Sequence, residues 1–180
     1  MKRLMVLLFE LTALRKGPQD MQTGLAFQQS VVLAYVLVNL VLLQMSSPWS
    51  TAVLQLLLDC LLMVSFTWPL LYVSGHQARF KQTMTALLGA DAVINFFALP
   101  ALASLNQEPS EIGIFAMLIL MLWHWLVIGH IYRHALERPL LFTLILAFLY
   151  LMLSSQIMEA VFPPMTMTPE IVEQASDITT

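Results

Sequence analysis

Five long apolar segments, separated by short polar stretches, make up most of this chain. About 20 apolar residues are needed for an α-helix to cross the hydrocarbon core of a bilayer, and each segment reaches that length. The sequence therefore predicts an all-α integral membrane protein with a five-helix transmembrane bundle over residues 26–162. The predicted spans are 26–45, 52–74, 82–103, 112–132 and 139–162.

The two ends of the chain differ from these spans. Leucines recur at helical spacing within residues 1–17, and lysine and arginine flank them, but the segment is too short to cross a bilayer. This pattern predicts an amphipathic helix lying at the membrane interface and ending at Gly17-Pro18, with a disordered cytoplasmic tail as the alternative. Residues 163–180 predict a polar, acidic tail.

Composition supports a membrane environment and argues against several functions. The chain is 59% hydrophobic and 11% charged, whereas about a quarter of the residues of a soluble domain are charged. A net charge of −3 without a basic patch is unlike a nucleic-acid-binding protein. Cys60 is the sole cysteine, so no internal disulfide is expected. No catalytic motif and no cofactor-binding motif is recognisable.

All 8 lysines and arginines fall in the N-terminal segment or in the loops after the second and fourth spans. Because basic loops stay in the cytoplasm, this distribution predicts a cytoplasmic N-terminus and a periplasmic C-terminus. The basic loops also predict a rim that contacts anionic lipid headgroups, with a partner membrane protein as the alternative. The predicted rim residues are Arg79, Lys81, His130, Arg133, His134 and Arg138.

Three stretches resemble a group of small, five-span proteobacterial inner-membrane proteins. They are LTALRKGPQDM (11–21), RFKQTMTALLGADA (79–92) and WHWLVIGHIYRHALE (123–137). The resemblance covers most of the chain and implies an architecture and a location in the bacterial inner membrane, but no activity. The layout is also similar to that of Yip1-type membrane proteins, which have five spans and a cytoplasmic N-terminus, although no motif is shared.

Polar residues inside the spans are the candidate functional residues, because an ionisable group in a membrane must face protein or water. Asp91 lies ~13 Å from the cytoplasmic start of the third span, and His124 lies ~12 Å from the cytoplasmic end of the fourth. The two side chains can therefore meet, and Asn95 shares the face of Asp91. The pair forms either a hydrogen bond that fixes helix packing or a proton or ion path. The third possibility is that the two residues do not meet.

A second polar layer is predicted near the outer face, where Asp59 and Gln156 reach nearly the same depth and Glu159 lies one turn closer to the surface. It forms either a protonatable cavity or a simple set of hydrogen bonds. The spacing of Ala86 and Ala90 predicts that the third span lies in the middle of the bundle, packed on the fourth and second.

His130 and His134 have the i, i+4 spacing of metal ligands, but no third ligand is recognisable, so no metal site is predicted. The sequence favours a non-enzymatic scaffold, assembly factor or accessory subunit that contacts lipid, a partner membrane protein or further copies of itself. The first alternative is a small proton-coupled transporter or permeation protein that uses Asp91 and His124. The second is an intramembrane lipid-modifying enzyme.

Overall fold

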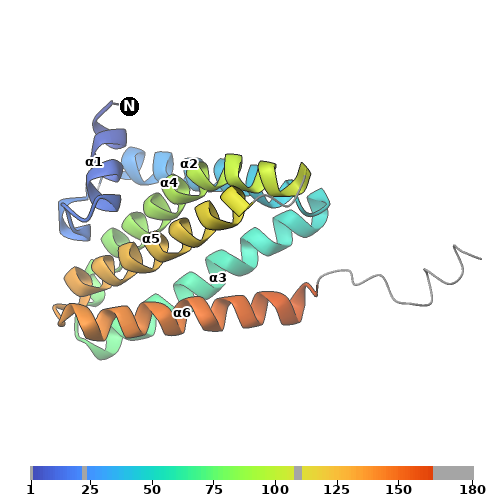
Figure 1. The fold of residues 1–180 in the computed structure, drawn as a ribbon. Helices are drawn as coiled ribbons and strands as arrows, with labels where there is room; N and C mark the ends of the chain where they lie inside the picture. Colours follow the sequence, from blue (N-terminus) through green and yellow to red (C-terminus); the bar gives the residue numbers. More distant parts are fainter. Residues whose placement is uncertain (1, 22–23, 108–110, 164–180) are drawn as a thin grey trace, which may run out of the picture.

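The chain forms a bundle of long α-helices (Figure 1). The computed structural model describes residues 2–21, 24–107 and 111–163, and all regular structure in these residues is helical. Apart from Pro163, the predicted acidic tail lies outside the described residues. The helices are α1 (Lys2–Thr12), α2 (Leu25–Gln44), α3 (Trp49–Val73), α4 (Phe80–Gln107), α5 (Glu111–Leu136) and α6 (Leu140–Val161), with single 3-10 turns at η1 (Pro18–Asp20) and η2 (Gln77–Arg79).

Five of these helices, α2 to α6, are long and apolar enough to cross a membrane. This confirms, for the described residues, the prediction of a wholly helical chain with five potential spans. Helix α5, predicted over 112–132, continues to Leu136, and α4, predicted over 82–103, continues through Pro100 to Gln107. Proline removes one helical hydrogen bond. The helix continues because Ala98 and Ala101, on either side of the proline, are buried against neighbouring helices.

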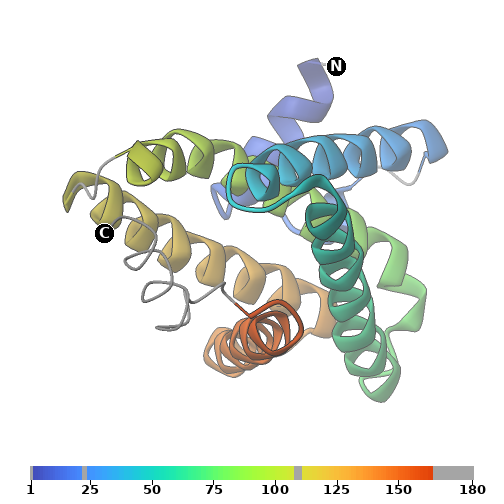
Figure 2. The same cartoon turned by 90° about the vertical axis from the view of Figure 1, so that its right-hand side faces the viewer.

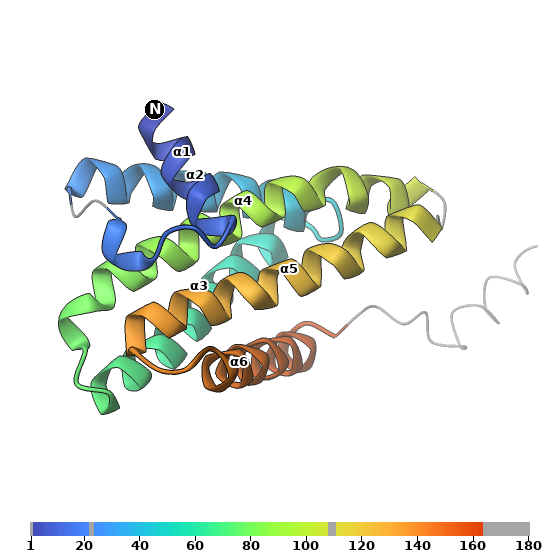
Figure 3. The same ribbon diagram turned by 60° about the vertical axis from the view of Figure 1, so that its left-hand side comes forward.

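Helix α4 lies in the middle of the bundle, between α2 and α5 (Figure 3). Within the described residues, 44% of its most apolar window is buried, against 17% for α2 and 22% for α5. The small side chains of Ala86 and Ala90 are almost fully buried, which lets the neighbouring helices approach closely.

The position of α3 differs from the expectation for the second span. The sequence predicts that this span packs on the third, and α3 does contact α4, but α4 packs chiefly on α2 and α5. Helix α3 instead lies at the edge of the bundle, beside α2 at one end and α6 at the other (Figure 2). The reason is that the polar face of α4 carrying Asp91 and Asn95 is hydrogen-bonded to Asn39 of α2.

Helix α1 runs across the long direction of the other helices (Figure 1) and packs on α4. Leu8 and Leu11 are buried in this contact, and Leu8 lies directly over Gly89. The helix is shorter than the predicted segment 1–17, because Leu14 adopts a left-handed conformation with φ of 61° and interrupts it. The buried leucine face is the one that the sequence predicts to be apolar, but here it contacts protein.

The indole of Trp123 anchors α1 to α5, since its Nε1 donates a hydrogen bond to the Thr12 carbonyl at 2.9 Å. We expect Trp123→Phe to cost about 1 kcal/mol and to loosen α1. Hydrogen exchange should rise at the amides of 6–12. Trp125→Phe is the matched control, because Trp125 donates to the Leu144 carbonyl of α6. If hydrogen exchange of the α1 amides is the same in Trp123→Phe and Trp125→Phe, the hydrogen bond to the Thr12 carbonyl does not hold this helix in place.

Candidate functional site: a polar cluster among four helices

Two helices of the bundle each present a pair of polar side chains one turn apart. Tyr35 and Asn39 share a face of α2, and Asp91 and Asn95 share a face of α4. These two faces meet. Tyr35, Asn39 and Asp91 are buried, and Asn95 is partly buried. A polar group without a hydrogen bond is costly in such an environment, so the four side chains must find partners in one another or in adjacent helices.

The Asp91 carboxylate lies at the centre of this arrangement, with two hydrogen-bond donors and an imidazole close to it. Its Oδ2 accepts from Asn39 Nδ2 at 2.9 Å and from Asn95 Nδ2 at 3.0 Å. Its Oδ1 lies 3.3 Å from Nε2 of His124 on α5. Asp91 is 6% exposed, so these partners replace the hydration that a carboxylate has in water. The donor set suits an ionised carboxylate.

The two asparagine amides are also fully engaged. Asn39 donates one hydrogen to Asp91 and the other to the Tyr35 carbonyl at 3.0 Å. Asn95 donates to Asp91 and to Asn39 Oδ1, the latter at 2.9 Å. Each amide is therefore held in one orientation, and the carboxylate it contacts is held with it.

A second carboxylate extends the arrangement to α3. The buried Tyr35 hydroxyl donates to Asp59 Oδ2 at 2.6 Å, and Cys60 Sγ lies 3.6 Å from the same hydroxyl. Four helices thus contribute to one set of side chains, which we call the polar cluster. Its members are Tyr35, Asn39, Asp59, Asp91, Asn95 and His124.

The structure brings Asp91, Asn95 and His124 together, as the sequence predicts, but the predicted outer layer does not form. Asp59 is hydrogen-bonded to Tyr35, and no hydrogen bond links it to Gln156 or Glu159 within the described residues. Gln156 and Glu159 are both exposed. Equal depth was the basis of that prediction, and it failed because Asp59 faces α2 while Gln156 and Glu159 lie on exposed parts of α6.

Sequence reasoning did not assign Tyr35 and Asn39 to the site. The signal that could have found them is their spacing: an aromatic hydroxyl and an amide at i, i+4 within an otherwise apolar span. The sequence does not show that α2 lies beside α4. That contact supplies the hydrogen-bond partners of Asn39, which are Asp91 and Asn95.

His124 also borders the outside of the bundle. Its side chain lines a groove of about 540 Å³ between α5 and α6, whose walls are otherwise almost entirely apolar. Trp125, Phe148 and Met152 line the same groove. Ser155 lies at its edge and also borders a recess of about 560 Å³ that contains Gln55 and Glu159. The imidazole therefore stands between the carboxylate of Asp91 and a groove on the bundle surface.

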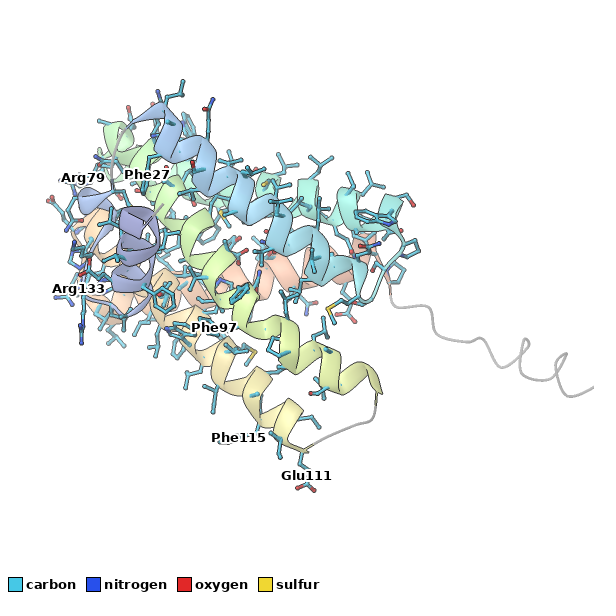
Figure 4. The ribbon with its side chains drawn as sticks, turned by 90° about the horizontal axis from the view of Figure 1, so that it is seen from above. Phe27, Arg79, Phe97, Glu111, Phe115 and Arg133 are labelled. Atoms are coloured by element: carbon cyan, nitrogen blue, oxygen red, sulfur yellow. The ribbon has the colours of Figure 1, made fainter. Side chains whose placement is uncertain are left out.

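The residues of the predicted rim gather at one end of the bundle, where Figure 4 labels Arg79 and Arg133. Arg79 donates to the His134 carbonyl at 3.2 Å and forms an ion pair with Glu137 at 2.5 Å. This hydrogen bond and the charge of Arg79 hold the pKa of Glu137 below its usual range. Lys81 and Arg133 are exposed, as is Arg138.

The two histidines of the rim differ from the expectation of headgroup contact. His130 is buried, and its Nε2 lies 3.1 Å from the Lys16 carbonyl, so it contacts the N-terminal segment. His134 is half-buried, with Nδ1 3.5 Å from Gln19 Nε2. Their rings are 4.6 Å apart, and no group of three or more possible metal ligands occurs among the described residues.

The fold and the polar cluster define a helical bundle with ionisable residues inside it, five of whose helices are long and apolar enough to cross a membrane. Comparison with family models, with curated proteins and with solved structures gives no match.

Proposed function

We propose that this chain is a small proton-coupled transporter or permeation protein in which Asp91 and His124 form the protonation site. The observation that carries the proposal is the contact between His124 Nε2 and Asp91 Oδ1 inside the bundle, with the same imidazole bordering the groove between α5 and α6. An ionisable pair placed inside a membrane is costly to maintain, and such pairs mark ion and proton pathways.

The chemistry of the pair fits proton transfer. Imidazole has two nitrogens and an ordinary pKa close to neutral, so it can take a proton on one side and release one on the other. An ionised Asp91 accepts hydrogen bonds from Asn39 and Asn95, and its other oxygen lies 3.3 Å from His124 Nε2. When Asp91 takes up a proton, one of its oxygens becomes a donor, and its contacts with these three groups must rearrange. Because the three groups lie on three helices, protonation is coupled to the contacts between α2, α4 and α5.

The setting of this function follows from the distribution of charge. Every lysine and arginine lies in the N-terminal segment, at the junction of η2 with α4, or at the junction of α5 with α6, which supports a cytoplasmic N-terminus and a periplasmic C-terminus. The resemblance to small proteobacterial proteins supports the bacterial inner membrane. In this orientation the groove beside His124 and the recess that contains Glu159, which share Ser155, both lie in the periplasmic half of α6.

A scaffold or accessory subunit is the second candidate, and one observation favours it. Every polar side chain of the polar cluster has a partner, and the cluster joins four helices. In this candidate function, the sole role of the network is to fix the order of the helices. The bundle then presents a surface to lipid or to a partner membrane protein.

Proton flux in proteoliposomes separates these two candidates. We expect the wild type to dissipate an imposed pH gradient, read by a trapped pH-sensitive dye, at a membrane potential set with potassium and valinomycin. Asp91→Asn and His124→Gln should each reduce the flux at least about tenfold, because neither replacement can carry the proton. Thr67→Val is the matched control, since it removes a buried hydrogen bond between Thr67 and Tyr132 without touching a titrating group of the cluster.

All variants are first checked for monodispersity and for an unchanged helical signal. A flux in Asp91→Asn equal to that of the wild type would refute the proposed site. A wild type that carries no flux above empty vesicles would refute the transporter proposal and leave the scaffold.

A further inference from the structure

Two recesses meet at the turn between α5 and α6, and Arg138 borders both of them. One recess is polar, with a volume of about 430 Å³, and is lined by residues of the basic loops. The other is apolar, with a volume of about 480 Å³, and lies between the end of α3 and the start of α6. Together they form a site with a charged end and an apolar end.

The polar recess carries an excess of positive charge. Arg79, Arg133 and Arg138 line it, and among the residues that the structure describes Glu137 is the only acidic one in its lining. Glu137 is already paired with Arg79. Arg133 and Arg138 are exposed, and neither forms a salt bridge with another described residue. Two guanidinium groups are therefore free to bind an anion, and the planar guanidinium fork matches the oxygens of a phosphate.

The apolar recess has the form of a chain-binding site. Pro69, Leu70 and Val73 of α3 form one wall, and Phe142 and Leu146 of α6 form the other. These residues belong to the ends of two helices that are apolar enough to cross a membrane, so the recess continues from the basic loops into the apolar part of the bundle. An occupant that fills both recesses must have a negative headgroup and a hydrocarbon tail.

We propose that this composite site binds one anionic phospholipid, with its phosphate against Arg133 and Arg138 and one acyl chain between α3 and α6. Charge complementarity selects the anionic headgroup, and the apolar walls select a lipid over a soluble phosphate. The site lies at the end of the bundle that carries Arg79 and Arg133 (Figure 4). Basic residues at the end of a membrane-spanning bundle attract anionic lipid headgroups. Bound there, the lipid would link α3 to the turn between α5 and α6.

Native mass spectrometry of the full chain in mild detergent tests this site. Dioleoyl phosphatidylglycerol should bind at least about tenfold more tightly than dioleoyl phosphatidylcholine, which has the same chains without the net charge. Arg133→Gln combined with Arg138→Gln should weaken phosphatidylglycerol binding about 30-fold, which corresponds to ~1 kcal/mol for each arginine. Arg15→Gln combined with Lys16→Gln removes the same charge from side chains outside both recesses and outside the predicted rim and should change the affinity less than about threefold.

The source of the phosphate is distinguished with smaller ligands. Inorganic phosphate and dihexanoyl phosphatidylglycerol should bind at least about tenfold more weakly than the dioleoyl lipid, because they cannot fill the apolar recess. Equal binding of inorganic phosphate would show a free-anion site and overturn the lipid assignment. An equal loss of phosphatidylglycerol affinity in both double variants would show that only the overall charge matters, and it would overturn the proposal. Equal affinity of the wild type for the two dioleoyl lipids would overturn it as well. The comparison of lipids uses the wild type, so it does not depend on the folding of any variant.

Discussion

Asn39→Leu should destabilise the bundle by about 3 kcal/mol, the cost of leaving a buried charged group short of a partner. Asn39 is 6% exposed and joins α2 to α4, because its amide donates to Asp91 and its oxygen accepts from Asn95. Leucine has a similar size but neither group. The variant leaves the buried carboxylate with one hydrogen-bond donor, Asn95, beside the His124 imidazole, and it leaves one hydrogen of the Asn95 amide without its acceptor.

The measurement is unfolding of the purified protein by titration with a denaturing detergent, followed by circular dichroism. Gln29→Leu is the matched control, since Gln29 is an exposed amide on the same helix. It should change the free energy of unfolding by less than about 0.5 kcal/mol, as surface substitutions usually do. A loss of stability in Asn39→Leu as small as that of the control would show that the asparagine contacts contribute little. Asn39→Leu with Asp91→Leu should recover part of the loss, because the carboxylate that Asn39 serves is then absent as well.

Gly129→Val should lower the free energy of unfolding by about 2 kcal/mol, within the range found for overpacking. A Cβ at this position would lie 2.5 Å from Leu144 Cδ2 and 3.3 Å from Leu144 Cα. The side chain of Leu144 can turn away, but its backbone cannot, so α5 and α6 must move apart. Separation of these helices would also widen the groove that His124 lines.

Gly89 provides the comparison for this prediction. A Cβ there would lie 2.4 Å from Leu8 Cδ2, which is the end of a flexible side chain, and 3.4 Å from Val31 Cγ1. Gly89→Ala should therefore displace Leu8 at a cost below that of Gly129→Val and disturb only α1. Unfolding curves of the two variants, together with hydrogen exchange in α1 and α6, separate the two effects. Equal destabilisation would contradict the distinction between backbone and side-chain contacts.

Depth along a helix could be predicted well from the sequence, and the pairing of Asp91 with His124 depended on depth. The rise per residue is constant, and two antiparallel helices joined by a short loop must lie side by side. The same reasoning failed for Asp59. Its helix, α3, has several possible neighbours, and depth alone does not say which of them a side chain faces.

The N-terminal segment shows the same limit. Its leucine spacing predicts an apolar face, and Leu8 and Leu11 are indeed buried. Whether that face covers lipid or protein depends on a contact with residues more than 70 positions away, such as Gly89 and Trp123. The burial of His130 follows from the same docking, because its partner is the carbonyl of Lys16.

The sequence by itself determined the helical class, the five apolar helices and the end of the bundle at which the basic residues gather. These properties follow from hydrophobicity and from helical geometry, which act locally along the chain. Only the tertiary structure decided that α2 lies against α4, that Tyr35 and Asn39 complete the polar cluster, and that Arg138 joins two recesses. The physical reason is that the order of helices around a bundle is set by many weak packing contacts and a few buried hydrogen bonds, whose partners are distant in the sequence.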